Sequence, residues 1–283
     1  MNWQIFEKTF NRAIEHCLSK QKLFLVFPVL VLCGLMTVIC RTISHAAGQW
    51  VQMSVAFLPI FLCAALLLGA GMVLVRIYHH EVKQIKFDYW KLIQNSKELF
   101  MGIPYLVVPL IFAYLILWMT LGIFYLVRSI PQVGPVMGSI FSFGPFLLVL
   151  GSLILGALSL VTLFFLTPIA ALRSQLTPKL TEEVFISLKA NPFMNFVLFL
   201  ISLLPLLVVV GFLSLAAVVT QILYVESTLG FSIALKWFFI MVPFCALLSP
   251  AVIFFFNFSA EAHALLLKSP SKSDELLVSK KAS

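Results

Sequence analysis

The sequence predicts an all-α membrane protein, a polytopic bundle of six transmembrane helices. Of its 283 residues, 61% are hydrophobic and only 11% are charged, whereas a soluble domain has about 25% charged residues. The excess apolar surface must therefore face lipid. Six stretches also approach or exceed the roughly 20 apolar residues that cross a bilayer. Lysine and arginine concentrate in every second connection between these stretches, as membrane topology requires.

The six predicted spans differ in length. The first is short, and the fourth and fifth are long enough that we expect them to tilt, kink or extend past the bilayer. The spans cover Leu23–Cys40, Met53–Ile77, Ile103–Val127, Phe141–Leu172, Phe193–Leu223 and Trp237–Phe258.

The basic residues predict the orientation of these spans. Three of the 19 lysines and arginines, Arg41, Arg128 and Lys236, lie on one side, and the rest lie on the other. Since basic connections stay in the cytoplasm, we predict a protein of the cytoplasmic (inner) membrane with cytoplasmic N- and C-termini. The same distribution accounts for the net charge of +8. We find no nucleic-acid motif and expect no nucleic-acid partner.

An amphipathic segment precedes each pair of spans on the predicted cytoplasmic side. In the first segment, Trp3–Cys17, apolar residues recur at three- and four-residue steps and form one helical face. The second segment is Phe87–Phe100, and the third is Thr181–Asn191. We expect interfacial helices here, with the apolar face of the first in the lipid headgroups.

The chain therefore reads as one integral membrane domain, residues 1–267, followed by a polar tail, residues 268–283, that we expect to be disordered. Within the domain we interpret residues 1–80, 81–175 and 176–267 as three repeated units, each an amphipathic helix followed by a membrane hairpin. Lys22–Pro28 and Glu98–Pro104 both carry Leu, Phe and Pro in register. The alternative is that any basic amphipathic loop would show this pattern.

This organisation resembles bacterial multi-pass membrane families of unassigned function, in the style of the membrane domain attached to some glycerophosphoryl diester phosphodiesterases. The resemblance rests on the amphipathic helix leading into a hairpin and on no signature motif. It implies an all-helical membrane fold. It implies no activity, because the catalytic barrel of those enzymes has no counterpart in this sequence.

No Asp, Glu, Lys or Arg lies in the middle of a predicted span, which argues against a proton relay or an ion path. The five cysteines show no ligand spacing, and we interpret them as packing residues. We find no catalytic constellation and expect neither an enzyme nor a cofactor.

One cluster of candidate site residues remains, at the predicted cytoplasmic ends of the spans. His79, His80 and Glu81 could bind a divalent ion together with Glu261 and His263, but adjacent histidines on a helix point in different directions, so we predict no metal site. The full candidate cluster is Arg76, His79, His80, Glu81, Arg173, Asn257, Glu261 and His263. Within it we predict that Glu261 braces Arg76 or Arg173, with Asn257 on the same helical face.

Two functional hypotheses follow. The first is a non-enzymatic protein that organises membrane lipids or binds other membrane proteins. The alternative is a transporter or permease subunit for an apolar or amphipathic solute. A continuous polar cavity between the spans would favour transport, and a tightly packed bundle would favour the first hypothesis.

Overall fold

The computed structural model describes residues 3–45, 49–85, 94, 97–131, 134–140, 142–172, 192–220 and 230–268. These residues form helices and the turns between them, and no strand occurs among them. Six helices are long and apolar enough to cross a membrane, which confirms the predicted fold class. Arg173, residues 87–93, the third amphipathic segment and residues 269–283 lie outside the described residues.

The helices follow the predicted order of spans, with two short helices at the connections. Their bounds are α1 Trp3–Glu15, α2 Lys20–His45, α3 Gln49–Val55, α4 Leu58–Val82, α6 Lys97–Arg128, α7 Gly134–Ile140, α8 Gly144–Ala171, α10 Pro192–Val219 and α11 Gly230–Lys268.

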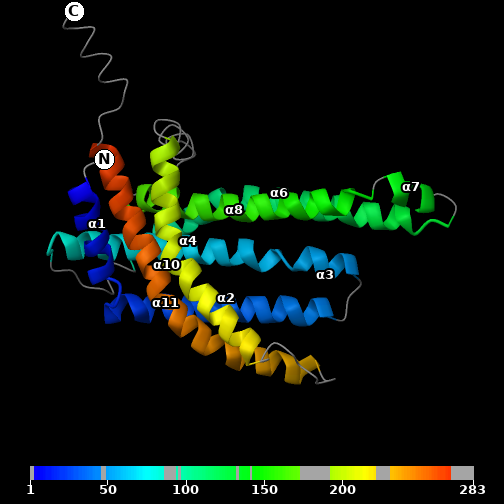
Figure 1. The fold of residues 1–283 in the computed structure, drawn as a ribbon, viewed down its shortest axis with the longest axis horizontal. Helices are drawn as coiled ribbons and strands as arrows, with labels where there is room; N and C mark the ends of the chain where they lie inside the picture. The colour runs from blue at the N-terminus through cyan, green and yellow to red at the C-terminus, as the bar shows by residue number, and fades with distance from the viewer. Residues whose placement is uncertain are drawn as a thin grey trace, which may run out of the picture.

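Helices α2, α4, α6 and α8 run side by side, and the α10–α11 hairpin crosses them obliquely (Figure 1). Helix α1 lies across the end of the bundle where α2 begins, and the C-terminal part of α11 reaches the same end. Helices α3 and α7 lie at the opposite end. The ends of the bundle therefore alternate along the chain in the order that the basic residues predict.

The second predicted span is divided near its N-terminal end. Helix α3 ends at Val55 and α4 begins at Leu58, with Phe57 preceding the first turn of α4. Pro59 lies in that first turn, where the missing N–H of a proline costs nothing. The carbonyl four residues before a proline, here that of Val55, gains no helical hydrogen bond, and α3 ends at that residue.

Helix α11 forms the centre of the bundle. It packs against α1, α2, α4, α8 and α10, and every residue from Ala251 to Ser259 is buried. The helix continues ten residues past the predicted end at Phe258 because Ala262 and its neighbours are buried as well. A glycine permits the closest approach, since a Cβ atom on Gly71 of α4 would overlap the ring of Phe256.

Candidate functional site

Lys22 lies in the first turn of α2 and has no exposed surface. Its Nζ atom is 2.6 Å from Oε2 of Glu81 at the end of α4. It also donates hydrogen bonds to Oδ1 of Asn257 on α11, at 3.4 Å, and to the carbonyl of His16, at 3.3 Å. A buried cation is costly unless it is paired and hydrogen-bonded. Lys22 meets both conditions, and its contacts join α2 to α4, to α11 and to the end of α1.

A second ion pair lies beside the first. The hydroxyl of Tyr78 on α4 donates to Oε1 of Glu261 on α11 at 2.6 Å. Nη1 of Arg12 on α1 lies 3.2 Å from the same oxygen. The Lys22 ammonium sits 4.9 Å from the centre of the Tyr78 ring, which is a cation–π distance. The two ion pairs therefore meet at Tyr78, and we call Arg12, Lys22, Tyr78, Glu81, Asn257 and Glu261 the polar cluster.

The polar cluster satisfies the C-terminal end of α1. The last carbonyls of any helix lack partners within the helix. Asn257 donates from Nδ2 to the carbonyl of Ala13 at 3.4 Å, and the thiol of Cys17 donates to the same carbonyl at 2.9 Å. With Lys22 on the carbonyl of His16, side chains of α2 and α11 complete the end of α1. A cation at this position also opposes the negative end of the helix dipole.

Two other groups complete the surroundings of the cluster. Nδ1 of His16 lies 3.5 Å from Oε2 of Glu81, and this contact becomes an ion pair when the imidazole is protonated. Burial raises the pKa of the Cys17 thiol to about 11, although the positive charge of Lys22 and the hydrogen bond with Asn257 act in the opposite direction. Cys17 therefore stays protonated at neutral pH and is a poor nucleophile there.

Aromatic packing adds to the attachment of α1. The rings of Phe10 and Phe254 meet edge to face at a centroid distance of 5.4 Å, and Phe6 and Phe10 both contact Phe258, at 6.2 and 6.1 Å. We expected this face of α1 in the headgroups, and instead these aromatic residues pack on α11. Ile14 remains exposed.

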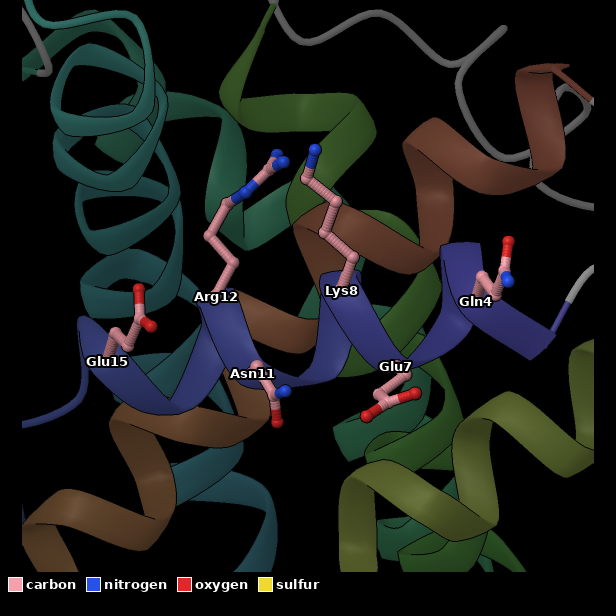
Figure 2. A pocket seen from close by; sticks show the side chains of 6 residues that line it. All are labelled: Gln4, Glu7, Lys8, Asn11, Arg12 and Glu15. Carbon is pink, nitrogen blue, oxygen red and sulfur yellow. The ribbon is translucent and has the colours of Figure 1, made fainter.

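The opposite face of α1 is polar and open. It forms a shallow hollow of about 430 Å³ whose lining residues all belong to α1. Figure 2 shows Lys8 and Arg12 projecting on one side of the helix, and Glu7 and Asn11 projecting on the other. The complete lining is Gln4, Glu7, Lys8, Asn11, Arg12 and Glu15.

The structure brings together only part of the predicted cluster. Glu81, Asn257 and Glu261 belong to the polar cluster, and the last two share a face that contacts α1. Among the described residues, Arg12 forms an ion pair with Glu261, while Arg173, one of the two predicted partners, lies outside them. Arg76 instead donates from Nε to the carbonyl of Ala171, at 2.7 Å, and so binds the end of α8.

The histidines of the predicted cluster do not converge on one point. Nδ1 of His80 is 2.7 Å from the carbonyl of Arg76, and its ring meets the ring of His79 edge to face. His263 is half-buried on α11. Among the described residues, no group of three or more His, Cys, Asp or Glu side chains is arranged to hold a metal ion.

Arg12, Lys22 and Tyr78 were not predicted as site residues from the sequence. Arg12 and Lys22 were counted as basic residues flanking the first span, which is the usual role of such residues. The sequence signal for Lys22 is that it directly precedes the apolar run of the first span. A helix that begins before this run places Lys22 against the neighbouring helices.

In comparisons with known proteins, no family model, curated protein or solved structure matches this chain. Chemically, the cluster pairs two cations with two carboxylates across four helices, and one of the cations, Lys22, has no exposed surface.

Proposed function

We propose that this multi-pass membrane protein is a non-enzymatic protein of the cytoplasmic membrane that organises lipids or binds partner proteins at its cytoplasmic end. Both chain termini lie in the cytoplasm in this proposal, as the distribution of basic residues predicts. The observation that carries it is the attachment of α1. The helix is held to α2, α4 and α11 by the polar cluster, while its outer face remains free to meet another molecule.

The internal pairing of the charges supports a structural role for the polar cluster. A catalytic lysine or carboxylate has to reach its substrate. The Lys22 ammonium is fully buried, and Glu261 is already engaged by Tyr78 and Arg12. A group held in this way fixes the position of a helix.

Close packing between the spanning helices supports the same proposal over transport. Two cavities beside α6 and α8, one lined also by α4 and the other by α3 and Phe57, each have a volume of about 10 Å³. Each is about the size of one water molecule. A permeating amphipathic solute would need a path many times larger at the points where these helices meet.

The test is co-purification in native lipid discs, with both the proteins and the lipids identified. A variant with two charges exchanged, Glu7→Lys with Lys8→Glu, keeps the net charge and alters only the outer face of α1. We expect the exchange to remove the proteins or lipids that are enriched with the wild type. Arg128→Gln, at the opposite end of the bundle, is the matched control and should remove none.

Two results would contradict the proposal. One is an identical set of co-purified proteins and lipids for the wild type and the exchanged variant. The other is a flux of an amphipathic solute across proteoliposomes that depends on the protein, which would support the permease alternative.

A further inference from the structure

Tyr114 carries a buried hydroxyl that the packing of its helix leaves without a partner. Only 2% of the residue is exposed, and the hydroxyl has no hydrogen-bond partner among the residues that the structure describes. An unpaired hydroxyl in a place without water costs free energy, and such groups are rare in native proteins. The position of Tyr114 in the middle of a spanning helix makes bulk water an unsuitable partner.

A cavity of about 10 Å³ lies beside Tyr114, between α3 and Phe57 on one side and α6 and α8 on the other. Its wall includes Ser54, Trp118 and Ser152 as well as Tyr114. The Ser152 hydroxyl donates to the carbonyl of Leu148 at 3.0 Å, and its oxygen can still accept a hydrogen bond. The cavity therefore offers hydrogen-bond groups from three helices.

The break between α3 and α4 lies at the same cavity. Met53, Ser54 and Phe57 all line it, and the helix is interrupted directly after Val55. Ordered water is one of the means by which membrane helices satisfy backbone groups released near a proline. The break lies beside the cavity independently of Tyr114, and it is a feature of the kind that ordered water satisfies.

A neighbouring cavity provides a contrast. It has the same volume of about 10 Å³ and is lined by Phe61, Val107 and Leu163, among others. Its two hydroxyls, on Ser159 and Thr162, donate to carbonyls of their own helix at 2.6 and 2.8 Å. The rings of Phe61 and Tyr114 pack 4.8 Å apart between the two cavities. The second cavity is of the apolar kind that stays dry.

We propose that the cavity at Tyr114 is a binding site for a single ordered water molecule, which accepts a hydrogen bond from the Tyr114 hydroxyl and joins the α3–α4 break to α6 and α8. The volume meets the lower limit of roughly 10–15 Å³ that one water requires, and the lining can supply the two to four polar partners that such a water needs. The proposal concerns the interior of the bundle and does not depend on the function proposed for α1.

The first test is water-edited solid-state NMR on proteoliposomes with labelled tyrosine, in which polarisation passes from water to nearby side chains. The Tyr114 signal is assigned by its loss in Tyr114→Phe. We expect transfer from water to Tyr114 in the wild type. In Val149→Ile, the added methyl group fills the cavity and the transfer should be lost. Val107→Ile makes the same substitution in the neighbouring cavity and should leave the transfer unchanged.

Absence of transfer to Tyr114 in the wild type would overturn the proposal. Equal transfer in Val149→Ile and Val107→Ile would overturn it as well, since the water would then lie elsewhere. Thermal unfolding of Tyr114→Phe gives a second measurement. A lowered melting temperature is expected when the hydroxyl binds a water, whereas an unchanged or raised temperature indicates a hydroxyl without a partner.

Discussion

Lys22 holds a positive charge without exposed surface at the point where α1, α2, α4 and α11 meet. Removing that charge leaves the Glu81 carboxylate with only the His16 imidazole, at 3.5 Å, among its described ionic partners. We predict that Lys22→Met lowers the free energy of unfolding by about 3 kcal/mol, the lower end of the range for breaking a buried pair. Glu81 keeps some exposure, and this places the effect at that end. Denaturant unfolding in detergent micelles measures it.

The matched control for this prediction is Lys20→Met, which removes an exposed lysine from the same turn. Its effect should stay within about 0.5 kcal/mol, as is usual for surface positions. The double variant Lys22→Met with Glu81→Gln should recover part of the loss, because no unpaired charge remains. An effect of Lys22→Met no larger than that of Lys20→Met would show that the pair contributes nothing.

Cys17 reports whether α1 is attached. Its thiol has a pKa of about 11 in the folded protein, raised by burial from 9.0. In a variant in which the other four cysteines are replaced, we predict that alkylation of Cys17 increases with pH around 11, whereas the detergent-unfolded chain reacts around 9. Lys22→Met should accelerate the reaction at neutral pH, because α1 then detaches more often. Identical pH profiles for the folded and unfolded chains would contradict the attachment.

The same shift makes the attachment of α1 depend on pH. Between pH 9 and 11 the attached state keeps its thiol proton and the detached state loses it. Stability falls with rising pH wherever the folded state binds more protons. The contribution of this thiol to attachment is therefore fully present below about pH 9 and is lost as the pH rises toward 11.

Individual site residues were predictable only where their surroundings made them unusual. Asn257, Glu81 and Glu261 were identified because they are polar residues at or near the ends of apolar spans, and Asn257 stands between Phe254–Phe256 and Phe258. Their partners were not predictable. The contact between Arg12 and Glu261 joins positions 249 residues apart, and periodicity within one helix carries no information about such a pair.

Helices α4 and α11 meet at a glycine whose replacement should be costly. The Cβ atom of an alanine at position 71 would overlap the Phe256 ring, which is itself fully buried. We predict that Gly71→Ala lowers the free energy of unfolding by about 1–3 kcal/mol, as is typical of overpacking. Adding Phe256→Leu should recover part of the loss by making room for the methyl group.

Gly211 in α10 is the matched control, since a Cβ atom there would meet nothing within 4 Å. Gly211→Ala should be neutral or should stabilise the helix by up to about 1 kcal/mol. Equal effects at the two positions would show that the contact with Phe256 is not what limits position 71.

The spans were predictable because each depends on local hydropathy, which the sequence shows directly. The interruption before Pro59 was not predicted, since membrane helices accommodate many prolines without breaking, as Pro28 in α2 and Pro205 in α10 do. The extra length of α11 was missed for a related reason. Glu261 and His263 suggested an end in water, whereas Glu261 is buried against α1 and α4.

The bundle as a whole has two different ends. One end carries α1, the polar cluster and the C-terminal part of α11, and the other carries α3 and α7 (Figure 1). Near the second end, Arg41 stacks over the Trp237 ring at 4.3 Å. Arginine and tryptophan are both typical of the boundary between lipid and water. Each end therefore has groups suited to an interface, and the distribution of basic residues predicts which interface is cytoplasmic.

The predicted orientation places α1 in the cytoplasm and α7 outside. Cysteines introduced into a variant without the native five test this at Asn11 on the polar face of α1 and at Val136 on α7, both of which are exposed. We expect an impermeant thiol reagent to label Val136→Cys in intact cells and to label Asn11→Cys only after the membrane is opened. This outcome follows from the retention of basic connections in the cytoplasm. Labelling of Asn11→Cys but not Val136→Cys in intact cells would invert the protein and place the outer face of α1 where no cytoplasmic partner could reach it.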